Sequence, residues 1–192
     1  TWLARDLAAW SGEVDLALIT IDADGLDAAF DAGADLALAR SASTPPGAAR
    51  LMGEVHAPLA APELAATVKD LASLEEARLI EDSSSHMGWA AWADARGAYG
   101  AGLRPGLRVD GALCALAMAQ AGAGVVLARK PLALDAIRSG RLAPVMADGD
   151  HATGEAYYLV PAPGRSLSRA AEALSDHLKT CAASRQDLAG EL

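Results

Sequence analysis

Residues 108–145 read RVDGALCALAMAQAGAGVVLARKPLALDAIRSGRLAPV, and this stretch decides the fold class. After a short strand, a helix is expected over Gly111–Gln120 and an apolar strand over Val125–Ala128. Pro131 can open a second helix, which Gly140 can close. A strand, a helix and a second strand in this order are typical of a βαβ unit, so the stretch predicts an α/β fold with parallel strands.

The same alternation continues toward the N-terminus. Apolar residues at helical spacing and short apolar runs are separated there by glycine, proline and polar turns. The expected elements are a helix carrying Leu3, Leu7 and Trp10, a strand over Val14–Thr20 ending in the turn Asp22–Gly25, a helix over Leu26–Phe30 stopped by Gly33, a strand over Ala34–Ala39, and extended chain over Ala49–Leu59.

The middle and the end of the chain follow a similar pattern. The middle is expected to hold a helix over Glu63–Asp70, a link over Leu74–Ile80, a polar loop over Glu81–Met87, a helix carrying Trp89 and Trp92, and a strand over Leu107–Val109. The end is expected to hold a strand over Arg141–Met146, a loop over Asp148–Glu155, a strand over Tyr157–Val160, and a helix with Leu167, Ala171, Leu174, Leu178 and Cys181 on one stripe, followed by a polar tail beyond Ala183. The chain therefore predicts two α/β units with short connections.

Composition excludes several classes of protein. The chain has 16 Lys and Arg against 25 Asp and Glu, a formal net charge of -9, and no basic stripe, so DNA binding by this chain alone is not expected. Cys114 and Cys181 are far apart and suggest neither a zinc site nor a disulfide framework, which favours a reducing compartment. No apolar run has the length of a membrane span, and the N-terminus lacks the features of a signal peptide.

A catalytic or cofactor site is not indicated. The four histidines are scattered without metal-ligand spacing, and no nucleophile with a base or paired carboxylates stands out. Gly122 and Gly124 follow a helix and precede a strand, whereas a dinucleotide fingerprint needs glycines between a strand and the following helix. We therefore interpret Gly122 and Gly124 as a helix C-cap and a site of close backbone approach. We expect the protein to bind no metal and no cofactor and not to be an enzyme.

Some polar residues have two readings. The loop Ser83–His86 can hold a polar or anionic ligand or can cap the helix that carries Trp89. Asp110 stands between a strand and a helix, where α/β sheets bind ligands and where carboxylates also cap helices. Tyr157 and Tyr158 point to opposite faces of one strand, so at most one can face a ligand. Cys114 is expected to serve in packing.

The order of these segments resembles the effector-binding domain of LysR-type transcriptional regulators. The resemblance runs from Leu26 to Leu178, through LDAAFDAGADLALARS (26–41), GWAAWADARG (88–97), the stretch 108–145 quoted above, and AYYLV (156–160). The second of these segments is similar to the subgroup that contains the glycine-cleavage and β-lactamase activators. No single segment is specific, but their order and spacing are.

The resemblance implies a two-lobed fold like that of type 2 periplasmic binding proteins, each lobe having a mixed, mostly parallel sheet. Residues 1–58 with 154–192 would form lobe I, and residues 59–153 would form lobe II. A small effector, polar or anionic, would bind in the cleft between the lobes. A cytoplasmic dimer or tetramer would contact promoter DNA only through a preceding winged helix-turn-helix, and neither a membrane nor a cofactor would be involved.

The effector pocket implied by the resemblance would draw on nine residues, which are Arg40, Ser41, Ser83, Ser84, His86, Asp110, Gly111, Ala112 and Tyr157. The chain departs from the family in two places. Gly111 and Ala112 stand where hydroxyl side chains are frequent, so hydrogen bonds from those side chains would be lost. The chain also begins close to the first helix, so we expect the first strand and the DNA-binding domain to be absent, and Thr1 could be the remnant of a pocket residue.

Two other functions remain open at this point. An exported solute-binding protein of a transporter would share the same two-lobed fold and would have a signal peptide upstream. An enzyme on this fold, such as a dehydratase or a deaminase, would need an acid and base pair that the sequence does not display.

Overall fold

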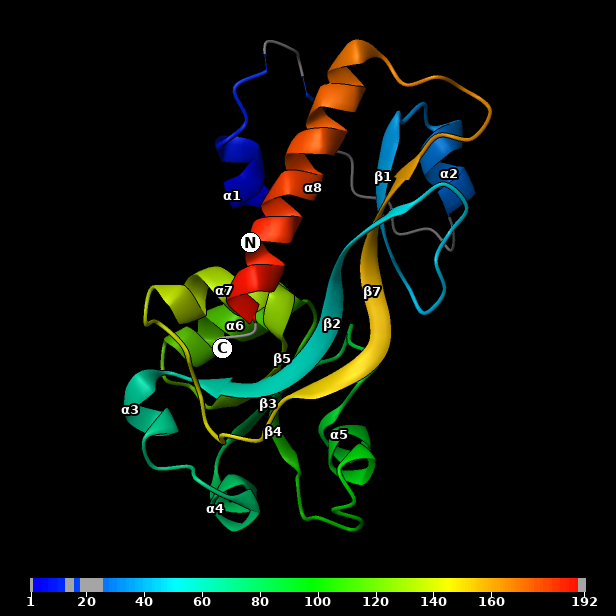
Figure 1. The fold of residues 1–192 in the computed structure, drawn as a ribbon. Helices are drawn as coiled ribbons and strands as arrows, with labels where there is room; N and C mark the ends of the chain where they lie inside the picture. The colour runs from blue at the N-terminus through cyan, green and yellow to red at the C-terminus, as the bar shows by residue number, and fades with distance from the viewer. Residues whose placement is uncertain (1, 13–15, 18–25, 190–192) are drawn as a thin grey trace. The chain divides into compact units, whose positions relative to one another are not determined.

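The computed structural model describes residues 2–12, 16–17 and 26–189 (Figure 1). The chain divides into two compact units: unit 1 consists of Thr1–Trp2 and Glu54–Thr153, and unit 2 of Leu3–Gly53 and Gly154–Leu192. Strands β2 (Ala49–Ala60) and β7 (His151–Pro161) both pass from one unit to the other. From the sequence, lobe II was expected to span residues 59–153. Unit 1 includes residues 54–153, and both ends of this segment lie within strands, in β2 and β7.

Unit 1 is built on a mixed sheet. Its strands are part of β2, β3 (Leu79–Asp82), β4 (Pro105–Val109), β5 (Val125–Arg129) and the short β6 (Ala143–Pro144). Strand β3 is parallel to β4 and β5, whereas β2 is antiparallel to β5 and β6. The carboxyl ends of β3, β4 and β5 therefore lie at one edge of the sheet.

Helices cover both faces of this sheet (Figure 1). Val125 and Leu127 of β5 lie in a core cluster with α5 (Trp89–Ala95), whereas Val126 and Ala128 lie in a second cluster with α6 (Ala112–Gln120) and α7 (Lys130–Arg138). A strand that is buried on both faces needs apolar side chains at every position. The apolar run Val125–Ala128 of β5 thus follows from the central place of this strand in the sheet.

The two tryptophans of α5 are core anchors. Trp89 and Trp92 are 0% and 1% exposed, and their rings meet edge to face with centroids 5.8 Å apart. Each indole N–H finds a backbone acceptor: Trp89 Nε1 donates to Ile80 O at 2.9 Å and Trp92 Nε1 donates to Gly149 O at 3.1 Å. Helix α5 therefore carries the two largest fully buried side chains among the described residues.

The expected helix over residues 63–70 was wrong. The structure has α3 (Pro62–Ala65) and a separate α4 (Leu71–Glu76), so helix replaces the first part of the expected link, and β3 follows it. Asp70 ends the intervening turn because its side chain accepts the N–H of Ser73 and caps α4. Capping by Asp70 therefore starts a new helix at Leu71, although the residues before it favour a continuous helix.

The buried face of α6 does not include Cys114. Leu113 is 61% exposed and Cys114 is exposed, whereas Ala115, Leu116 and Ala119 are buried. The packing role expected for Cys114 was therefore wrong. Because α6 carries apolar residues all round, its periodicity could not indicate which face is covered.

Unit 2 contains the antiparallel pair of β1 (Leu36–Ser41) and β7, with α2 (Leu26–Asp31) packed against it. Helix α1 (Trp2–Ala8) meets α8 (Arg169–Ala189), where His177 Nε2 donates to Asp6 O at 2.8 Å. The expected strand over residues 14–20 and the turn over 22–25 lie mostly outside the described residues.

The ends of β7 and α8 extend beyond their expected limits. Strand β7 begins at His151, inside the expected loop, because half-buried polar residues that alternate with exposed Ala152 and Gly154 still form a strand there. Helix α8 continues to Ala189, beyond the point where its apolar stripe ends. In contrast, β6 is shorter than expected, because Pro144 has no N–H to donate.

Candidate functional site

The loop after β3 is organised by the carboxylate of Asp82. Asp82 Oδ1 accepts the backbone N–H of Ser84 at 3.0 Å and the Ser84 hydroxyl at 2.6 Å. The backbone N–H of Ser83 donates to Val109 O of β4 at 2.8 Å. Ser83, Ser84 and His86 are exposed, and because the Ser84 hydroxyl is bound to Asp82, the loop presents the side chains of Ser83 and His86 to solvent.

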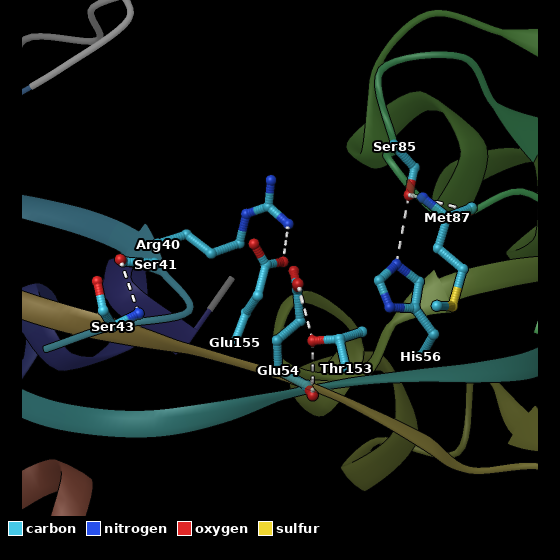
Figure 2. A network of polar contacts seen from close by, with 9 residues as sticks. All are labelled: Arg40, Ser41, Ser43, Glu54, His56, Ser85, Met87, Thr153 and Glu155. Atoms are coloured by element: carbon cyan, nitrogen blue, oxygen red, sulfur yellow. Dashed lines mark hydrogen bonds and ion pairs between the residues drawn. The ribbon is translucent and has the colours of Figure 1, made fainter. Parts of the chain in front are cut away.

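These serines do not cap α5. The N-cap of α5 is Gly88, without a hydrogen bond from a capping side chain. Ser85, instead of capping, donates its hydroxyl to Met87 O at 3.1 Å and lies 3.3 Å from His56 Nε2 (Figure 2). The capping alternative for the serine loop is therefore wrong.

The turn after β4 is held by the same carboxylate. Gly111 is the N-cap of α6, with φ 107 and no capping side chain, and its N–H donates to Asp82 Oδ1 at 3.2 Å. Asp110 is exposed and does not cap the helix, so the capping alternative for this residue is also wrong. Asp82 of the neighbouring strand reaches the N–H of Gly111 instead, because parallel pairing brings Asp82 opposite Val109.

The end of β5 supplies the balancing positive charge. Arg129 Nη2 lies 3.5 Å from Asp82 Oδ2, and the two side chains are 21% and 5% exposed. Arg129 Nε is buried without an acceptor in the part of the chain that the structure describes. The next residue, Lys130, pairs with Asp150 at 2.5 Å, one residue before β7 begins.

A small pocket lies beside this ion pair. Its volume is about 10 Å³, and its polar lining consists of Asp82, Ser85 and Arg129. Ala112 and apolar side chains of β5, α6 and α7 complete the lining. A volume of this size holds about one water molecule.

His56 and Glu54 lie in β2, where it enters unit 1. His56 is 2% exposed and stands opposite Arg129 in the pairing of β2 with β5. Glu54 is 1% exposed, and the Thr153 hydroxyl donates to its backbone and side-chain oxygens at 3.5 Å (Figure 2). Buried polar groups of this kind are costly unless they are hydrogen-bonded, so these contacts fix β2 against β7.

The predicted residues of unit 2 lie on β1 and β7. Arg40 Nη1 pairs with Glu155 Oε2 at 2.5 Å, and Ser41 Oγ accepts the N–H of Ser43 at 3.1 Å (Figure 2). Tyr157 stands opposite Arg40 in the strand register. Tyr158 points to the other face, packs in the cluster with α2, and accepts the Thr44 hydroxyl at 3.3 Å. Tyr157 is therefore the tyrosine that shares a face with Arg40.

Hydrogen bonds thus join Ser84 and Gly111 through Asp82, and backbone pairing brings Ser83 alongside them. Sequence reasoning missed Asp82, Arg129, His56 and Glu155. The charge of Arg40 was visible in the sequence, but its carboxylate partner follows only from the β1–β7 register. The ligand roles of all these residues stay predictions.

Membrane-spanning helices and clusters of metal-ligating side chains are both absent from the described ranges. No described helix is both long and apolar enough to cross a membrane. Among the same residues, no cluster of three or more His, Cys, Asp or Glu side chains is arranged to hold a metal ion.

Comparison with known families gives a match over residues 3–182 to the LysR substrate binding domain. The chain belongs to this family. It is accordingly the effector-binding domain of a LysR-type transcriptional regulator, and the expected family is confirmed. The expected periplasmic-binding-protein-like α/β fold is confirmed with it.

Solved LysR-type effector domains share this fold. The effector domain of the transcriptional regulator AmpR of Pseudomonas aeruginosa is 26% identical, with a TM-score of 0.76 over 100% of this chain and 93% of that one. The AmpR effector-binding domain of Citrobacter freundii is 20% identical, with a TM-score of 0.70 over 95% of this chain and 90% of that one. The likeness to AmpR is consistent with the subgroup expected from residues 88–97. Among curated proteins, none matches the LysR-type domain described here.

Proposed function

We propose that this LysR-type domain binds a small polar metabolite through the loops at the carboxyl ends of β3, β4 and β5. The observation that supports the proposal is the gathering of Ser83, Ser84, Asp110 and Gly111 at that edge of the sheet. In open α/β sheets, ligands bind beyond the carboxyl ends of parallel strands. Exposed hydroxyls and a carboxylate there suit an effector with several hydrogen-bonding groups.

Arg40, Ser41 and Tyr157 of unit 2, together with His86 and Ala112 of unit 1, are proposed as further effector contacts. The Arg40 guanidinium already has Glu155 as an ionic partner, and the Arg129 guanidinium has Asp82. An effector with an anionic group, a zwitterion included, would therefore compete with a carboxylate at either arginine, whereas a neutral polar effector would not. Compounds with uncharged polar groups should therefore be tested first as ligands.

A thermal-shift screen of amino acids, aromatic acids and cell-wall peptide fragments tests effector binding. A compound at about 100 times its dissociation constant adds roughly 2.7 kcal/mol, which corresponds to a rise of about 5–10 °C in the melting temperature of a domain of this size. Ser83→Ala and Tyr157→Ala should reduce the rise, whereas Ser184→Ala, at an exposed serine of α8, should leave it unchanged.

The proposal also has a clear negative outcome. It fails if no compound of these classes stabilises the domain while Ser83→Ala and Tyr157→Ala leave promoter regulation intact in the complete regulator. A compound that stabilises the wild type and all three variants equally would place the effector elsewhere on the domain.

We further propose that the complete regulator acts in the cytoplasm as a dimer or tetramer on promoter DNA and that the effector shifts its arrangement without catalysis. Membership of a regulator family supports this, and it favours a regulator over an exported solute-binding protein. Sedimentation of the complete regulator with and without a stabilising compound checks it, since an effector that acts through assembly must change the sedimentation coefficient or the population of oligomers.

A further inference from the structure

One buried carboxylate contacts three separate connections of unit 1. Asp82 Oδ1 accepts donors from the serine loop after β3 and from the turn after β4, and Asp82 Oδ2 faces Arg129 at the end of β5. The three connections are distant in sequence and meet because β3 is parallel to both β4 and β5. A single side chain therefore fixes the mutual position of all three.

The environment of Asp82 favours a charged carboxylate over an amide. The residue is 6% exposed, and a buried charge is costly unless it is paired and hydrogen-bonded. Here one oxygen receives three hydrogen bonds and the other faces a guanidinium. Hydrogen bonds to an ionised acceptor are roughly twice as strong as neutral ones, so the charge strengthens every contact to the loops.

These loops are tied down through Asp82, which accepts both the backbone N–H and the hydroxyl of Ser84. Gly111 has a positive φ of 107, a conformation that residues other than glycine rarely adopt, and its N–H is bound by the same carboxylate. Ser83 and Asp110 are exposed on the same loops. The exposed side chains of Ser83 and Asp110 are thus separate from the carboxylate that orients the loops.

We infer that Asp82, balanced by Arg129, is a positioning residue of the effector site, holding the loops after β3, β4 and β5 in the arrangement that binds the effector. The inference rests on the proposed function, because the loops that Asp82 holds are the loops proposed to bind the effector. Asp82 itself touches the loops and Arg129, and it acts on the effector through them. Pre-organisation of this kind lowers the entropy cost of binding.

Amide hydrogen exchange of the domain, followed residue by residue by NMR, tests the positioning without any ligand. In Asp82→Ala, exchange of the Ser84 and Gly111 amides should rise at least about tenfold, because hydrogen bonds to a charged group are lost. The Val126 amide in the centre of the sheet serves as the internal reference. Asp94→Asn, which removes a charge at an exposed position of α5, should leave all these rates unchanged.

A pair of conservative variants separates positioning from general stability. Asp82→Asn keeps one acceptor oxygen but turns an amide N–H₂ toward the Arg129 guanidinium, so donors face donors. Adding Arg129→Gln supplies a carbonyl acceptor at that point, and the double variant should recover slow exchange at Ser84 and Gly111 relative to Asp82→Asn alone. Exchange that rises equally at Val126 in Asp82→Ala, or that is unchanged at Ser84 and Gly111, overturns the positioning role.

Promoter regulation by the complete regulator tests whether Asp82 is needed for the response to the effector. Asp82→Asn should abolish the response while promoter binding is retained, and Asp94→Asn should respond as the wild type does. Faster exchange at Ser84 and Gly111 with an intact response would overturn the role of Asp82 in effector binding and would also count against the proposed site. Unchanged exchange, in contrast, would overturn the positioning role and leave the proposed site standing.

Discussion

Gly124 shows how closely two backbones approach inside unit 1. A Cβ atom built at Gly124 would lie 2.2 Å from the carbonyl oxygen of Arg78, and the N–H of Val125 donates to that same oxygen at 2.9 Å. A methyl group cannot occupy this space because the contacting atom is backbone and cannot rotate away. The close approach expected from the sequence is confirmed, and so is the preference for glycine on steric grounds.

Substitution of Gly124 should therefore destabilise the domain strongly. We expect Gly124→Ala to lower the free energy of unfolding by more than about 3 kcal/mol, since overpacking against backbone forces β3 and β5 apart. Gly122→Ala is the matched control, because Gly122 has φ 78 with open space around it and should cost about 1–2 kcal/mol. Urea unfolding followed by tryptophan fluorescence measures both. Equal losses would show that steric contact at Gly124 is unimportant.

The positions of local turns could be predicted, whereas contacts that depend on strand pairing could not. The serine loop and the start of the helix after Asp110 were expected because turn and helix-start signals are local, although the capping roles considered there were wrong. Asp82 was missed because its donors on Gly111 and Arg129 reach it only through the pairing of β3 with β4 and β5. Sequence periodicity does not show which residues of two neighbouring strands lie opposite each other.

At the scale of the element, α4 shows a local signal that the sequence analysis overlooked. Asp70 and Ser73 form a capping box: the Asp70 side chain accepts from Ser73 N at 2.9 Å, and Ser73 Oγ accepts from Asp70 N at 3.1 Å. The hydrogen bond from the Ser73 backbone, followed by that from its hydroxyl, holds the pKa of Asp70 below its ordinary value. The ionised cap is thus favoured in the folded state.

This shift predicts a pH-dependent contribution of Asp70 to stability. A carboxyl whose folded pKa is depressed stabilises the fold above its unfolded pKa of about 3.9 and loses that contribution as pH falls through the folded pKa. Asp70→Ala should therefore melt below the wild type at pH 7, and the gap should narrow in acid below about pH 4. Asp70→Asn keeps the cap without titrating and should stay close to the wild type at pH 7. A gap between Asp70→Ala and wild type that is constant with pH would contradict this account.

Other elements show why the rest of the fold was harder to predict. The order of elements from β4 to α7 followed from glycine, proline and apolar spacing, and the structure confirms it. The orientation of α6 did not, since Leu113 and Leu116 are equally apolar and only one of them is buried. The start of β7 was hidden because a half-exposed strand can carry His151 and Glu155 without an apolar run.

At the scale of the whole molecule, the acidic charge governs encounters with nucleic acid. With a net charge of -9, the domain repels the phosphate backbone. The domain alone should leave the fluorescence anisotropy of labelled promoter DNA unchanged even at about 50 mM salt, where nonspecific binding is strongest. The complete regulator should raise it. Anisotropy that increases with the domain alone and falls with added salt would refute the prediction.

The exposed thiol of Cys114 can be labelled close to the proposed effector site. Cys114 lies in the first turn of α6, just after the Asp110–Ala112 turn, whereas Cys181, the second cysteine of the chain, is half-buried. An accessible thiolate reacts readily with maleimides. A fluorophore attached to Cys114 of the native sequence would therefore report changes in the neighbouring loops during a compound screen, without any engineered labelling position.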